Sequence, residues 1–187
     1  MDEKKITLAE RLGMTAHISG LRHKARRLGL PALDDLANEA IARGCYHYAP
    51  SFDHGLESRV SERELANDEH AIALLTVANP YDPRIIRIGA MMLGADGNEP
   101  RDLVRLAVRE RCECVVRYVA NCALRYEPDS PFWMKLLAAL PSGPMPKVGV
   151  MPHHSRFVSD SGLIAPRTFG KPTWLRPIAL RAASHAA

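Results

Sequence analysis

Apolar residues recur about once per helical turn between residues 61 and 141, and this spacing limits the fold more than any other feature of the chain. A capping box begins at Ser61, and Pro83 and Pro131 each follow a residue that favours the position before a helix. Helices are therefore predicted over residues 61–77, 83–94, 99–127 and 131–140. The helix over residues 99–127 is long, and a break near Cys112 is possible in it. The fold class is predicted to be all-α, without any β-sheet.

This core is predicted to be a helical bundle or a short helical-repeat-like stack. Three of its segments share one pattern, namely IIRIG at residue 85, LVRLA at residue 103 and VVRYV at residue 115. Because their spacing is unequal, two interpretations stay open: a degenerate repeat of the kind that stacks into solenoids, or amphipathic helices of similar composition.

Residues 1–48 predict a small N-terminal unit of three helices. Thr7 and Glu10 fit a capping box, and Gly13 would end the helix that it opens. The third helix follows Pro31. The second is predicted from about residue 15, with four apolar side chains on its inner face: Ile18, Leu21, Ala25 and Leu28. Residues 49–60 are expected to be a linker, because no apolar period is sustained there.

The stretch LAERLGM at residues 8–14 resembles the first helix and turn of the helix-turn-helix family of bacterial DNA-binding domains. The resemblance covers residues 8–30 and implies that the second helix would enter the major groove of DNA. The residues opposite or beside its apolar face are the candidate nucleic-acid contacts: Ser19, Arg22, His23, Lys24, Arg26 and Arg27. The alternative is an ordinary helix whose basic face is solvated.

Residues 142–187 are predicted to be an extended, basic, proline-rich arm. Half of the fourteen prolines fall in residues 141–187, yet the segment is too apolar for a disordered tail. Such an arm would lie over a surface, which belongs either to the chain's own core or to a partner. Its candidate partner contacts are aromatic and cationic: Arg156, Phe157, Phe169, Trp174 and Arg176.

The formal net charge of +4 is unevenly distributed. Residues 1–30 hold seven Lys and Arg against three Asp and Glu, residues 31–141 hold twelve against seventeen, and residues 142–187 hold six against one. Basic ends favour an anionic partner, or else they dock on the acidic middle of the same chain.

Other classes of protein fit the sequence less well. No apolar run is long enough for a membrane span, and the start MDEKKITLAERLG is too charged for a secretory signal, so we expect a cytoplasmic protein with no membrane partner. The four cysteines are sparse and are expected to be reduced thiols.

No catalytic residue, metal site or cofactor is predicted. Cys112 and Cys114 would point in different directions on a helix, and His153 and Ser155 lie in the proline-rich arm without a rigid support. Phosphate-loop and dinucleotide motifs are missing from the sequence. The acidic residues of the long helix are expected to be ordinary surface residues: Asp102, Glu110 and Glu113.

These observations predict a non-enzymatic binding or adaptor protein that engages a macromolecular partner through its basic ends. The partner would be a protein, or a second copy of the chain contacted by the arm, or a nucleic acid. Two alternatives stay open: a helix-turn-helix DNA-binding regulator that uses residues 7–29, and an enzyme whose site is assembled across helices.

Overall fold

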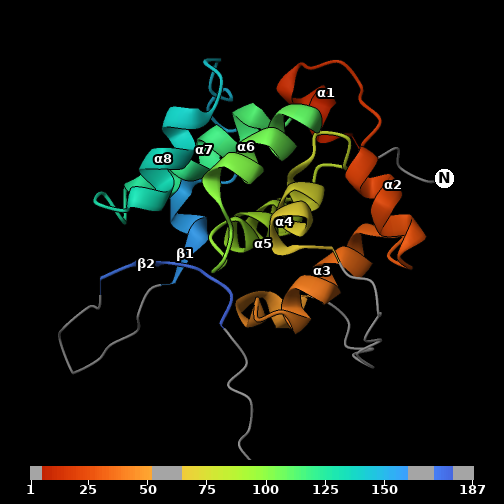
Figure 1. Ribbon diagram of the computed structural model, residues 1–187, viewed down its shortest axis with the longest axis horizontal. Coiled ribbons are helices and arrows are strands. Elements are labelled where there is room, and N and C mark those ends of the chain that lie inside the picture. Colours follow the sequence, from red (N-terminus) through yellow and green to blue (C-terminus); the bar gives the residue numbers. More distant parts are fainter. Residues whose placement is uncertain (1–5, 52–64, 160–170, 179–187) are drawn as a thin grey trace, which may run out of the picture.

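The computed structural model describes residues 6–51, 65–159 and 171–178, and this part of the chain is mainly helical, as the apolar spacing predicts (Figure 1). Its α-helices are α1 (Leu8–Leu12), α2 (Gly20–Arg27), α3 (Leu33–Ala42), α4 (Asn67–Leu75), α5 (Pro83–Leu93), α6 (Pro100–Arg109), α7 (Glu113–Leu124) and α8 (Pro131–Ala139). Two 3-10 helices, η1 (Tyr46–Ser51) and η2 (His154–Phe157), and two strands, β1 (Val158–Ser159) and β2 (Thr173–Trp174), complete it.

The two strands correct the expectation of a protein without any sheet. β1 and β2 are antiparallel, with Val158 opposite Trp174 and Ser159 opposite Thr173. Because this ladder is only two residues long and lies within the predicted arm, the helical class is unchanged. The predicted helical core contains no strand among its described residues, 65–141.

Helices α4 and α5 form the centre of the molecule (Figure 1). All residues of α4 from His70 to Leu75 are buried. At Gly89 of α5, an added Cβ would lie 2.8 Å from the Leu75 side chain, so only glycine allows this close approach of the two helices. Their buried apolar faces supply much of the stabilisation of the core.

The helix predicted over residues 61–77 corresponds to α4, which is shorter than predicted among the described residues. Ala66 is extended, and its backbone N–H donates to the Glu69 carboxylate at 3.3 Å, so the helix begins at Asn67. Residues 61–64, where the predicted capping box lies, are outside the described residues. Most of the predicted linker, residues 52–60, is outside them as well.

Helices α6, α7 and α8 pack on one side of the central pair, and α2 and α3 pack on the other (Figure 1). One apolar core takes side chains from both sides, among them Leu21 of α2, Leu36 of α3 and Trp133 of α8. The break expected near Cys112 is confirmed, because α6 ends at Arg109 and α7 begins after Cys112. Among the helices described, none has the length and apolar character needed to cross a membrane.

The first helix follows the sequence prediction. Thr7 and Glu10 form the capping box, and Gly13 ends α1 in the left-handed conformation, with φ of 69°. The backbone N–H groups of Leu8 and Ala9 donate to carbonyls of residues 79 and 77, which holds α1 against the connection between α4 and α5.

The predicted start of the second helix is wrong. The connection between α1 and α2 spans residues 13–19, and Ile18, predicted to be inward, is 92% exposed. Helix α2 begins only at Gly20 because Ser19 caps it. The Ser19 hydroxyl accepts a hydrogen bond from the Arg22 backbone N–H at 3.0 Å. The tight turn of a helix-turn-helix is therefore replaced by a longer connection.

Candidate functional site

Helix α2 has one buried face and one basic face. Leu21 and Ala25 are buried in the common core, as the apolar spacing predicts. His23, Arg26 and Arg27 are exposed on the other side, and the helix has no acidic residue in its first turn. This distribution makes α2 an amphipathic helix whose outer face carries positive charge.

Three of the six candidate nucleic-acid contacts are engaged within the chain. Ser19 is 5% exposed and is used as the cap of α2. Arg22 is half-buried and donates to the Pro31 carbonyl at 3.0 Å; burial, with Arg26 nearby, lowers its pKa. Lys24 donates to both oxygens of the Glu69 carboxylate, at 2.7 and 2.6 Å.

The remaining three residues define the outer face of α2, which we call the α2 basic face: His23, Arg26 and Arg27. Within the parts of the chain that the structure describes, the two guanidinium groups make no hydrogen bond or ion pair. Three other arginines, Arg84, Arg105 and Arg176, are each paired with a carboxylate, whereas the exposed Arg101 and Arg111 have no such pair in the described part of the chain. Arg26 and Arg27 thus have donors and charge available for a partner.

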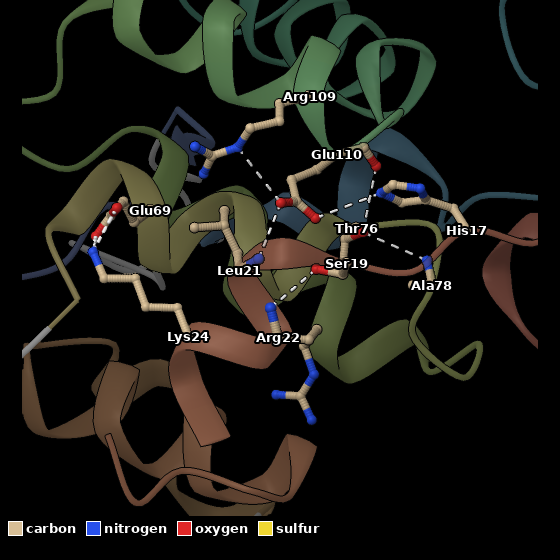
Figure 2. Close-up of polar contacts among 10 residues, drawn as sticks. All are labelled: His17, Ser19, Leu21, Arg22, Lys24, Glu69, Thr76, Ala78, Arg109 and Glu110. Atoms are coloured by element: carbon tan, nitrogen blue, oxygen red, sulfur yellow. Dashed lines mark hydrogen bonds and ion pairs between the residues drawn. The ribbon is translucent and has the colours of Figure 1, made fainter. Parts of the chain in front are cut away.

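A buried carboxylate fixes the start of α2 (Figure 2). Glu110, at the break between α6 and α7, is 0% exposed, and its Oε1 accepts a hydrogen bond from the Leu21 backbone N–H at 3.0 Å. The nitrogen Nε of Arg109 lies 3.8 Å from the same oxygen, and Nε2 of His17 lies 3.8 Å from Oε2. Negative charge at a helix N-terminus is stabilised by the helix dipole, so Glu110 fits this position.

The break that carries Glu110 has its own local cause. Arg111 has a φ of 54°, and the backbone N–H of Cys112 returns to the Ala107 carbonyl at 2.9 Å, which ends α6. The hydroxyl of Thr76 donates to the Glu110 carbonyl at 3.4 Å (Figure 2). The expectation that Glu110 is an ordinary surface residue is therefore wrong, because the break turns its side chain inward.

The described residues of the C-terminal arm pack on the chain's own helices. Phe157 is 1% exposed and Trp174 is 3% exposed. Their rings stack with centroids 5.6 Å apart, and the Trp174 ring meets Trp133 of α8 edge-on at 5.5 Å. These two aromatic residues complete the core, so they are not exposed anchors for a partner.

The other candidate contacts of the arm differ in their surroundings. Arg176 forms an ion pair with Glu127, whose carboxylate also accepts from the Trp133 indole at 2.8 Å. Arg156 is exposed, and its carbonyl accepts from the Tyr48 hydroxyl at 3.3 Å. Phe169 lies outside the described residues.

An open groove of about 570 Å³ lies between the start of α4 and the outer face of α6. Asp68 and Glu69 line one side, and Arg105 and Arg109 line the other. Three of these four charges already have partners: Lys24 pairs with Glu69, Asp102 pairs with Arg105 at 2.9 Å, and Glu110 lies 3.8 Å from Arg109. The groove therefore has little uncompensated charge to attract a ligand.

The residue types of a metal or hydrolytic site are not brought together in residues 6–51, 65–159 and 171–178. No group of three or more His, Cys, Asp or Glu side chains there could hold a metal ion. The four cysteines form no disulfide in this structure, and three of them are buried. The His153 ring accepts from the Ser155 backbone N–H at 3.4 Å, a local cap of η2.

A scan of known protein families and searches of curated proteins and of solved structures each found no match to this chain.

Proposed function

We propose that this chain is a non-enzymatic helical binding protein that engages an anionic macromolecular partner through the α2 basic face. The observation that carries the proposal is that Arg26 and Arg27 are exposed and unpaired in the described part of the chain. Unpaired cations on one face steer anionic partners toward it and form charge-assisted hydrogen bonds on contact.

The support beneath the face strengthens this proposal. Leu21 and Ala25 anchor α2 in the core, Ser19 caps it, and Glu110 accepts from its first turn. A helix fixed in this way loses little backbone freedom when a partner binds, so more of the contact energy appears as affinity. We therefore assign partner contact to α2 and rigidity to the helices beneath it.

Two features of the sequence interpretation are revised in this proposal. Contact by the C-terminal arm is left out, because Phe157 and Trp174 are buried against the chain's own core. A groove-reading helix pair is the weaker alternative, because α1 is held by residues 77–79 and the connection over residues 13–19 is longer than a helix-turn-helix turn. Nucleic acid is retained as an alternative partner for the same face.

One observation favours the enzyme alternative, namely that Glu110 lies close to His17. The carboxylate is fully buried and accepts a hydrogen bond from the first turn of α2. The exposed cations, and not this pair, support the proposed function.

The test is a binding measurement with two defined polyanions, a labelled poly-glutamate peptide and a labelled DNA duplex, at low and at physiological salt. The double variant Arg26→Ala/Arg27→Ala is expected to lose at least about tenfold in affinity for the polyanion that the wild type binds. The matched control is Arg101→Ala/Lys135→Ala, which removes the same charge from exposed positions on α6 and α8. Equal losses in both double variants, or no loss in the first, would overturn the proposal.

A further inference from the structure

Ile18 is an exposed apolar side chain directly before the α2 basic face. It is 92% exposed, and only Val148 is more exposed among the large apolar residues that the structure describes. Burial of an apolar side chain stabilises a complex, so a partner that covered Ile18 would bind more tightly.

Ile18 does not lie in a loose loop, because both of its neighbours are held. Ser19 is buried and caps α2, and the His17 ring is mostly buried with Nε2 at 3.8 Å from Glu110 (Figure 2). The side chains on each side of Ile18 are thus packed against the protein, while its own side chain is exposed. A fixed anchor of this kind costs little entropy when it is covered.

Ile18 lies at the N-terminal end of the basic helix. It directly precedes the N-cap Ser19, and His23 is the fourth residue of α2. Arg26 and Arg27 follow His23 at the spacings of three and four that share a helix face. These four exposed residues, Ile18, His23, Arg26 and Arg27, belong to α2 and the residue before its cap, and we call them the Ile18 strip.

We infer that the partner of the Ile18 strip is a protein segment that combines carboxylates with an apolar side chain, the carboxylates pairing with Arg26 and Arg27 and the apolar group covering Ile18. This inference rests on the proposed function, since it names the class of partner for the same face. Apolar anchors beside charged groups are the usual composition of a protein interface. Phosphates of a nucleic acid would pair with the two arginines but would leave Ile18 uncovered.

The experiment uses the full chain and two labelled acidic peptides of equal charge. One peptide has a central Leu-Phe pair between runs of Asp and Glu, and the other has Ser-Ser in its place. The wild type is expected to bind the Leu-Phe peptide at least about tenfold more tightly than the Ser-Ser peptide. Ile18→Ser is expected to remove most of this preference, whereas the matched control Ile6→Ser, at another exposed isoleucine, is expected to keep it.

The outcomes separate the inference from the proposed function. If the wild type binds both peptides equally, or if Ile18→Ser keeps the preference, the apolar anchor is refuted while the contact by Arg26 and Arg27 stands. If Arg26→Ala/Arg27→Ala binds both peptides as the wild type does, the proposed function itself fails. If only a DNA duplex binds, the protein class of partner is refuted.

Discussion

The backbone N–H of Leu21 donates a hydrogen bond of 3.0 Å to the buried carboxylate of Glu110, which joins the first turn of α2 to the break between α6 and α7. These two residues are far apart in the sequence, and their contact fixes where α2 lies on the core. The orientation of the α2 basic face therefore depends on a residue that belongs to a different helix pair.

Replacement of Glu110 by alanine is expected to lower the free energy of unfolding by about 2 to 4 kcal/mol, because the buried N–H of Leu21 loses its acceptor. Glu110→Gln retains an acceptor oxygen and is expected to cost less than Glu110→Ala. Urea unfolding measures both. Glu99→Ala, at an exposed residue without a side-chain cap hydrogen bond, serves as the control and should change stability by less than about 0.5 kcal/mol.

A second prediction concerns the cap of α2. Ser19→Ala is expected to destabilise the protein by about 1 kcal/mol, because the Arg22 backbone N–H loses the hydroxyl that accepts from it. Ile18→Ser should leave the free energy of unfolding within about 0.5 kcal/mol of the wild type, since the side chain is exposed. A large loss in Ile18→Ser, measured by thermal unfolding, would mean that Ile18 is in the core as the apolar period predicts.

The third prediction is a pH dependence caused by His70. Burial, with Arg43 nearby, lowers the pKa of His70 to about 4, and Nε2 donates to the Leu36 carbonyl at 2.8 Å. The unfolded chain takes up this proton near pH 6.5, whereas the folded chain takes it up only near pH 4. Neutral His70 therefore contributes about 3 kcal/mol to the free energy of unfolding above pH 6.5. This contribution is lost as the pH falls from 6.5 to 4.

The variant His70→Gln isolates this contribution, because the glutamine amide can still donate to the Leu36 carbonyl but does not titrate. Urea unfolding between pH 4 and pH 7 should show a shallower decline for His70→Gln than for the wild type. The exposed His23→Gln is the control and should follow the wild type. Equal slopes for all three proteins would show that His70 is not the titrating group.

The fourth prediction concerns the C-terminal arm. Trp174→Ala removes a buried ring packed on Phe157 and Trp133 and is expected to lower the free energy of unfolding by about 3 to 5 kcal/mol. Thr173→Ala, at the exposed neighbouring position, should have a much smaller effect. Under conditions where Trp174→Ala is still folded, its affinity for an acidic peptide should equal that of the wild type. If Trp174→Ala lost affinity for the peptide without losing stability, the arm would be part of the binding surface.

Local signals account for the parts of the fold that the sequence predicts correctly. The capping box of Thr7 and Glu10 and the prolines at the start of α5 and α8 act within one helical turn, so their effects do not depend on the rest of the chain. The inward positions of Leu21 and Ala25 follow from helix periodicity in the same way.

The parts that sequence reasoning misses depend on tertiary contacts. Glu110 lies in a run of charged residues and gives no local sign of burial; only the break after it, near Cys112, could have drawn attention to it. Ile18 has the spacing of an inward residue, but the cap at Ser19 places it before the helix. Whether the arm lies on its own core is decided by surfaces more than 20 residues away in the chain, such as Trp133 for Trp174.

The most direct test of the central claim is a map of backbone amide chemical shifts during titration with the acidic Leu-Phe peptide. The largest shifts are expected on residues 18–28, with those of Ile18, Arg26 and Arg27 among them. Largest shifts on the outer faces of α6 and α8, with residues 18–28 unchanged, would contradict partner contact by α2.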